Sequence, residues 1–150
     1  MAKQSAGILL YRRRTDLEVF LVHPGGPFFA KKDKGSWSIP KGEFESEEPL
    51  DAARREFAEE TGVVLPGPFT ELIPVKQKSG KMVYAWASEG DVDESKLVCN
   101  TFSMEWPPKS GKQKEFPEVD RGAWFTLVQA REKILESQIP LLKQLEQLIS

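Results

Sequence analysis

Three glutamates on one predicted helix are the residues of this chain best suited to chemistry. Glu56, Glu59 and Glu60 stand at i, i+3 and i+4, so a helix places them on one side. At an effective dielectric of about 20 and a separation of roughly 6 Å, repulsion costs on the order of 2–3 kcal/mol per pair. A hard divalent cation such as Mg²⁺ or Mn²⁺ relieves that repulsion, because it prefers carboxylate oxygens. The spacing predicts a metal site, and the alternative is an acidic helix face in solvent.

A loop, a helix and a second loop position these glutamates. Pro49 suits the first helical turn, where a missing N–H has no partner to lose, and Gly62 suits the position just past the end. Between them, Leu50, Ala53 and Phe57 recur at helical spacing and predict an apolar stripe that faces a core. The helix is therefore anchored on one side and carries its charges on the other.

The stretch from Trp37 to Val63 resembles the Nudix box, written G-x5-E-x7-R-E-U-x-E-E-x-G-U with U a bulky apolar residue. Residues 55–63, Arg-Glu-Phe-Ala-Glu-Glu-Thr-Gly-Val, match its second half without a gap, and seven residues separate Glu47 from Arg55. Only four residues separate Gly42 from Glu47. The first loop is one residue short, or Glu48 takes the role of Glu47 with the helix shifted.

The resemblance extends to residues 23–28, 37–43 and 115–121, and covers the chain from about residue 3 to its end. These segments are similar to a bacterial subgroup of Nudix (MutT-like) hydrolases described as predicted NTP pyrophosphohydrolases. The Pro40–Glu43 segment, Pro-Lys-Gly-Glu, is also similar to diadenosine polyphosphate hydrolases.

The resemblance implies roles for particular residues. Magnesium, or manganese in its place, would bind carboxylate oxygens and the Gly42 carbonyl. Glu118 stands six residues before Trp124, where such enzymes often supply a further metal-binding or basic glutamate, and Glu115 is the reserve. Glu56 or Glu118 would orient or deprotonate the attacking water, and Arg55 would clamp the glutamates. The expected metal ligands are Gly42, Glu56, Glu59, Glu60 and Glu118.

Basic and aromatic residues near the box are candidates for holding substrate. Lys41 precedes Gly42 in a segment tied on both sides, which favours a phosphate contact over a solvated charge. Lys31 and Lys32 lie in a lysine-rich loop, and Lys114 follows Pro107-Pro108; each is either a phosphate ligand or a solvated loop charge. Trp106 either stacks on a nucleobase or is a partly buried anchor.

Composition limits the remaining classes. A chain of 150 residues that is 39% hydrophobic suits one globular domain, taken here as residues 1–150. A formal charge of −2 argues against a strong grip on long nucleic acid. No apolar run approaches the roughly 18–20 residues of a membrane span, and no signal peptide is visible, so a cytoplasmic location is the default. His23 and Cys99 are single, which excludes zinc sites built from several such ligands.

Alternation and turn residues predict the elements that carry the site. Strands are expected over residues 5–11, 17–23, 37–39, 69–76, 82–88, 100–106 and 119–127. Helices are expected over 49–61, 128–136 and 138–149, and a loop over 107–114. One central and two terminal helices among strands predict an α/β fold in which both faces of the sheet are covered, an α/β/α sandwich. The resemblance implies the same Nudix fold with a mixed β-sheet.

The combined expectation is a metal-dependent hydrolase of a phosphoanhydride bond in a small nucleotide, acting as a monomer or homodimer. A dinucleoside polyphosphate is favoured because of residues 40–43, with a (d)NTP close behind. The alternatives are an ADP-ribose or RNA-end pyrophosphohydrolase, or a nucleotide-binding Nudix module with weak or no turnover.

Overall fold

The computed structural model describes residues 3–149. Within them the chain forms nine strands: β1 (Gln4–Arg13), β2 (Leu17–Pro24), β3 (Lys41–Phe44), β4 (Thr70–Glu71), β5 (Val75–Lys76), β6 (Met82–Glu89), β7 (Thr101–Glu105), β8 (Gln113–Pro117) and β9 (Val119–Thr126). The helices are α1 (Pro49–Thr61), α2 (Leu127–Lys133) and α3 (Ile139–Leu148), with short 3-10 helices η1 (Glu94–Lys96) and η2 (Glu136–Gln138).

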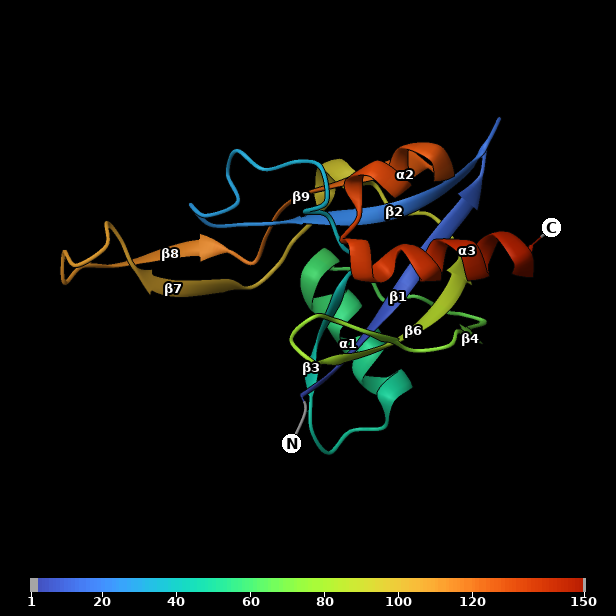
Figure 1. Ribbon diagram of the computed structural model, residues 1–150, viewed down its shortest axis with the longest axis horizontal. Helices are drawn as coiled ribbons and strands as arrows, with labels where there is room; N and C mark the ends of the chain where they lie inside the picture. The colour runs from blue at the N-terminus through green and yellow to red at the C-terminus, as the bar shows by residue number, and fades with distance from the viewer. Residues whose placement is uncertain (1–2, 150) are drawn as a thin grey trace.

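Seven strands form one mixed sheet (Figure 1); five lie in the order β4-β6-β1-β2-β9, and β3 and β5 pair with β1 and β6 off this path. β1 runs parallel to β6 and antiparallel to β2 and β3, and β5 joins β6 at the edge. The first half of β1 therefore lies between β6 and β3, the strand that starts the box. A fully buried run from Ser5 to Leu10 explains why β1 is central, because both of its faces must be covered.

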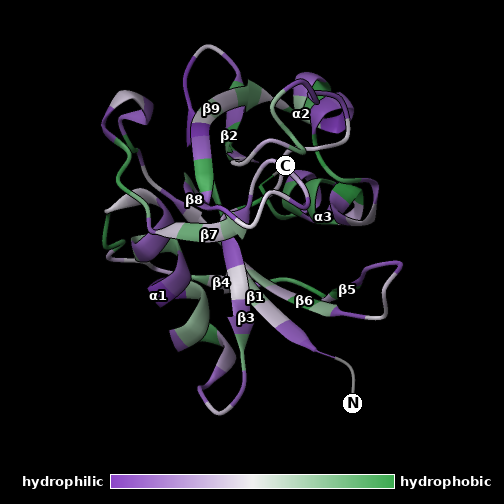
Figure 2. Cartoon of the chain, turned by 90° about the vertical axis from the view of Figure 1, so that its left-hand side faces the viewer, coloured by the Kyte–Doolittle hydropathy of each residue, from purple (hydrophilic) through white to green (hydrophobic). Residues whose placement is uncertain are grey.

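Two hydrophobic clusters cover opposite faces of the sheet. On one face, Phe57 of α1 packs in a cluster with Ile8 and Phe20. On the other face, Leu9 and Leu21 share a cluster with the C-terminal helices. Figure 2 shows α1 on one side of the sheet and α2 and α3 on the other. The predicted α/β/α sandwich with a mixed sheet is confirmed.

Three predicted elements differ in detail. Residues 37–39 form only isolated bridges, Ser38 to Val22 and Trp37 to Ile134, because the segment crosses from the sheet to the end of α2. Residues 69–76 are not one strand; β4 and β5 are separated around Pro74, which has no N–H to donate to a ladder. The helix predicted over residues 128–136 is shorter, because α2 starts at a Thr126 capping box and ends at Lys133.

The predicted loop over residues 107–114 is the turn of a hairpin whose second strand was not expected. β7 and β8 pair antiparallel as a separate two-stranded sheet, which we call the arm, and Trp106 N–H donates to the Lys112 carbonyl across its tip at 2.9 Å. Figure 1 shows the arm projecting beyond the main sheet beside the loop that follows β2. Phe102 and Phe116 pack across it with ring centroids 6.0 Å apart.

Gln138 connects the C-terminal helices to the segment that enters the box. Its side chain is fully buried; Oε1 accepts from Ile39 N–H at 3.0 Å, and Nε2 donates to Ser38 Oγ at 2.9 Å. Gln144 makes the same kind of two-way contact with the backbone of Ile73, but at the surface.

These two glutamines form a matched pair for a stability measurement. Gln138→Ala leaves the buried Ile39 N–H without a partner and is expected to lower the free energy of unfolding by about 2 kcal/mol. Gln144→Ala exposes its partners to water and is expected to cost less than about 1 kcal/mol. Urea unfolding followed by circular dichroism measures both, and equal losses would contradict the assigned role of Gln138.

Candidate active site

The helix α1 holds the site's glutamates and is fixed at both ends. Pro49 occupies the first turn, and Gly62 closes the last turn in the left-handed region at φ 80°. Ala52, Ala53 and Phe57 are buried against the sheet. Next to this apolar stripe, Glu56 lies against the backbone of Gly42 on β3 and Glu60 is buried, whereas Glu59 is partly exposed.

Arg55 gathers three carboxylates around one guanidinium. Its Nε and Nη2 donate to Glu47 at 2.6–3.0 Å, and its Nη1 donates to Glu56 at 2.8 Å and to Glu59 at 3.1–3.2 Å. The hydrogen bond to Glu47 leads the causes that raise the pKa of Arg55. Glu47, not Glu48, is therefore the glutamate that faces Arg55, and the missing residue lies in the loop after Gly42.

Glu60 is the carboxylate that Arg55 does not neutralise. It is only 8% exposed, and among residues 3–149 its Oε2 has no hydrogen-bond partner. Burial raises the pKa of Glu60 to about 9, with the nearby charge of Glu56 as the second cause. The Lys41 N–H and the charge of Lys41 act in the opposite direction. The Oε2 oxygen of Glu60 is therefore a buried acceptor without a donor among the described residues.

Glu56 packs directly on the backbone of Gly42. A Cβ placed on Gly42 would lie 2.0 Å from the Glu56 carboxylate, so only glycine leaves this space open. Burial also raises the pKa of Glu56, although Arg55 opposes the shift. The Glu56 carboxylate is thus held between the guanidinium of Arg55 and the backbone of β3.

Glu118 comes from the C-terminal part of the chain and lies near Glu56 and Glu60. It lies in the bend between β8 and β9, where its N–H donates to Asn100 at 2.9 Å and its carbonyl accepts from Gly25 at 3.0 Å. Its charge contributes to the raised pKa values of both Glu56 and Glu60. Glu60, Glu118 and Lys41 line one pocket of about 230 Å³, with Phe29 on its wall.

Lys41 has a neighbour that the sequence did not indicate. Burial lowers the pKa of Lys41, and the second cause is the charge of Lys81. Lys81 precedes β6 and binds Glu43 of the box at 2.8 Å. No local motif marks Lys81, because its position depends on the long-range pairing of β1 with β6 and β3.

The remaining candidates lie on the arm and on the loop after β2, outside the residues that line the pocket. Phe28 and Trp106 connect the two segments, with ring centroids 5.8 Å apart in an edge-on contact. Lys32 Nζ lies over the Phe29 ring, and Lys114 Nζ lies over Phe116. Lys31 is exposed on the loop, and Glu115 is exposed on β8 opposite Ser103.

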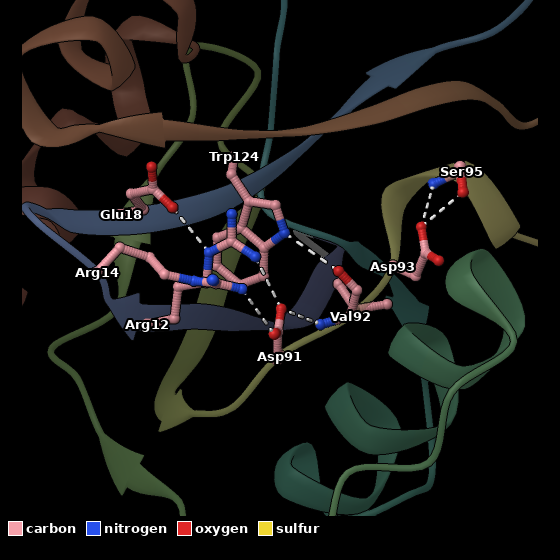
Figure 3. Close-up of polar contacts among 8 residues, drawn as sticks. All are labelled: Arg12, Arg14, Glu18, Asp91, Val92, Asp93, Ser95 and Trp124. Atoms are coloured by element: carbon pink, nitrogen blue, oxygen red, sulfur yellow. Dashed lines mark hydrogen bonds and ion pairs between the residues drawn. The ribbon is translucent and has the colours of Figure 1, made fainter.

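A second charged cluster lies at the far end of β1 and is internally neutralised (Figure 3). Arg12 donates to Glu18 at 2.7 Å and to Asp91 at 2.9 Å, and Arg14 donates to Asp91 at 3.2 Å. The Arg12 guanidinium also lies 4.0 Å from the Trp124 ring centroid. These contacts give the arginines a structural role at the strand end.

The residues of the pocket fit a hard divalent cation. All the side-chain donors are carboxylate oxygens, one buried Glu60 oxygen is unpartnered, and Gly42 keeps a backbone close to Glu56. Within residues 3–149 no three carboxylate, imidazole or thiolate groups already converge as a complete metal cage. Arg55 instead holds oxygens of Glu56 and Glu59, so metal binding would compete with these ion pairs.

Comparison with known proteins agrees with this geometry. The sequence matches the model of the NUDIX domain over residues 1–145. The chain belongs to the Nudix family. Nudix hydrolases act on nucleoside diphosphate derivatives, and the family generally uses divalent cations. The comparison with curated proteins gives no match.

Solved structures share this Nudix fold at low sequence identity. A Caenorhabditis elegans Ap4A hydrolase in a binary complex is 21% identical, with 97% of each chain covered and a TM-score of 0.66. The NUDIX domain of Shewanella oneidensis NrtR, complexed with ADP ribose, is 16% identical, with 100% of this chain and 90% of that chain covered and a TM-score of 0.69. A MutT structure from work on Aliivibrio salmonicida and Vibrio cholerae is 15% identical, with 95% and 93% covered and a TM-score of 0.57.

Between residues 3 and 149 of this Nudix domain, no helix is both long and apolar enough to cross a bilayer.

The buried carboxylate of Glu60 predicts a measurable effect on the metal-free Nudix domain. Its raised pKa means that its contribution to stability is present below the ordinary value of 4.5 and is lost as pH rises toward about 9. Glu60→Gln removes this loss, and we expect the variant to gain on the order of 1–2 kcal/mol at pH 8 and little at pH 5.

The measurement is urea unfolding in chelator at both pH values. Glu59→Gln is the matched control, because that carboxylate is partly exposed and pairs with Arg55, so its loss should not stabilise the fold. A native protein that is more stable than Glu60→Gln at pH 8 would contradict this account of the pocket.

Proposed function

We propose that this chain is a magnesium-dependent hydrolase that cleaves a phosphoanhydride bond in a nucleoside polyphosphate. The substrate is a dinucleoside polyphosphate or a (d)NTP. The observation that carries the proposal is the pocket itself, where the unpartnered oxygen of Glu60 lies with Lys41 and Glu118 beside Glu56. A cation and a polyphosphate together would satisfy both signs of charge there.

The proposed ligands for magnesium, or manganese in its place, are the Gly42 carbonyl, Glu56, Glu59, Glu60 and Glu118. A cation held by these residues would supply positive charge against the phosphate oxygens and would lower the pKa of a nearby water. A family that generally uses divalent cations supports this assignment.

The residues of the chain then divide the work. Glu56 or Glu118 accepts the proton of the attacking water; burial raises the pKa of Glu56, which makes it a stronger base than an exposed glutamate. Arg55 keeps Glu56 and Glu59 in place during the reaction. Lys41 donates hydrogen bonds to the phosphates and offsets the charge that develops on them. Water attacks directly, so no covalent intermediate is required.

The loop after β2 and the arm are proposed to hold the part of the substrate beyond the reacting phosphates. Lys31, Lys32 and Lys114 place positive charge there, and Trp106 is an aromatic surface for a base. Phe28 touches Trp106, so the two segments form one continuous surface next to the pocket that Phe29 lines. An extended substrate with a second nucleoside would use this surface most fully.

A substrate panel tests the proposed activity. The native chain with magnesium is assayed against dinucleoside polyphosphates, (d)NTPs, ADP-ribose and triphosphorylated RNA, with products identified. Glu56→Gln is expected to lower kcat at least about 10²-fold, because general-base and electrostatic roles are each of that size. Glu48→Gln makes the same change on an exposed residue at the start of α1 and should retain full activity.

The panel also separates the alternatives. Tight nucleotide binding without turnover would identify a binding module instead of an enzyme. Turnover confined to ADP-ribose or to RNA ends would reassign the substrate. Equal rates for the native chain and Glu56→Gln would remove the proposed role of Glu56.

Gly42→Ala tests the packing of Glu56 on the box strand. The added Cβ collides with a side-chain carboxylate, which can swing away, so the fold should survive while Glu56 leaves its place. We expect a near-native melting temperature, a weaker magnesium-induced rise in that temperature and at least a tenfold loss of activity. Thermal melts with and without magnesium measure the first two effects. A variant with native activity would show that Glu56 need not lie against the backbone of β3.

A further inference from the structure

His23, the single histidine of the chain, is fully buried near the end of β2 and lies outside the proposed catalytic set. Its Nδ1 is 2.9 Å from Asp120 Oδ1 on β9, and its Nε2 is 2.7 Å from the Lys32 carbonyl in the loop after β2. The ring meets Trp37 edge-on, with centroids 5.1 Å apart. It therefore touches three separate segments.

Both polar partners of the ring are acceptors. A carbonyl oxygen can only accept, and an ionised carboxylate can only accept. A neutral imidazole has one N–H and one lone pair, so it would place a lone pair against an oxygen on one side. At distances of 2.7 and 2.9 Å, and with Asp120 ionised, both contacts are satisfied together only when both ring nitrogens carry protons.

The charges around the ring match this protonation. Asp120 is the carboxylate in direct contact, and Arg121 lies farther out, 3.9 Å from the same Asp120 oxygen and over the Trp37 ring. On the other side of Trp37, Asp33 accepts from the indole N–H at 2.8 Å and is paired with Lys133. The buried imidazolium would thus have one carboxylate as its own counterion.

The contacts place His23 between the two segments that complete the pocket. Its Nε2 holds the loop at Lys32, three residues after Phe29, which lines the pocket. Its Nδ1 holds β9 at Asp120, two residues after Glu118, and Gly25 N–H donates to the Glu118 carbonyl at 3.0 Å. A change at His23 therefore reaches the substrate loop directly, whereas the Glu118 backbone keeps its own hydrogen bonds to Gly25 and Asn100.

We propose that His23 is a positioning residue held as an imidazolium, which fastens the substrate loop at Lys32 to the strand that carries Glu118. The kinetic part of this inference rests on the proposed hydrolase function, whereas the protonation and the fastening do not. Loss of the fastening affects how the loop meets substrate, so KM should change more than kcat.

The protonation is read directly from nitrogen-15 NMR of the metal-free and substrate-free protein at pH 7. Because His23 is the sole histidine, its two ring-nitrogen signals need no assignment to a residue. Two signals with the shifts of protonated nitrogens are expected, and a spectrum with one protonated and one bare nitrogen would overturn the imidazolium. This result is independent of whether the chain hydrolyses anything.

Variants test the fastening. Asp120→Asn keeps an oxygen that accepts from Nδ1 but removes the counterion, so His23 should become singly protonated. His23→Gln has one donor and one acceptor at its tip and cannot satisfy both partners. Hydrogen exchange of residues 25–36 is expected to speed up in both variants, at least threefold. Asp16→Asn removes one charge from an exposed turn and serves as the control, with unchanged exchange.

The kinetic readout uses the best substrate of the panel. Asp120→Asn and His23→Gln are expected to raise KM at least threefold while kcat stays within twofold. Native exchange and native KM in the folded Asp120→Asn variant would overturn the proposal even if His23→Gln failed to fold. If no substrate is turned over, the NMR and exchange results still decide the inference, and only the proposed function fails.

Discussion

The structure of the site depends on one buried carboxylate, that of Glu60, which Arg55 does not neutralise. Glu60 sits beside Glu56 with one oxygen unpartnered, and burial moves its pKa to about 9. Arg55 cannot relieve this, because its donors are already taken by Glu47, Glu56 and Glu59. An uncompensated buried acid is costly in any fold. Under the proposed function, a cation that enters the pocket lined by Glu60 would offset this cost.

The central strand makes that arrangement possible. β1 pairs with β3 on one side and with β6 on the other, and its partners bring Lys41 and Lys81 to the same region from distant parts of the chain. Because both faces of β1 are covered by helices, the strand has little freedom to shift. The Glu60 carboxylate therefore lies against a closely packed scaffold.

The features that the sequence could predict are those encoded by residues close together in the chain. The α1 helix, its caps and the shared face of its glutamates are encoded within a short stretch, and the structure agrees with them. Arg55 was expected to clamp the glutamates, but the choice of Glu47 over Glu48 needed the geometry of the first loop. The position of Lys81 and the contacts of His23 depend on pairing between strands that are distant in the sequence. No local sequence pattern predicts them. The second strand of the arm was not predicted, because the prolines and lysines of residues 107–114 indicated only a loop.

Proteins of one fold can bind different ligands, because they share the sheet and helices but not every segment outside them. The structures compared above share this fold at 15–21% identity, although one is described as an Ap4A hydrolase and another is complexed with ADP ribose. Function therefore cannot be read from the sheet and helices alone. In this chain the loop after β2 and the arm lie outside the main sheet and meet at Phe28 and Trp106. The positions of these two segments must still be fixed next to the pocket, because Glu118 lies in the bend between β8 of the arm and β9. The buried contacts of His23 with Asp120 and the Lys32 carbonyl supply that limit without adding a group to the proposed reacting centre.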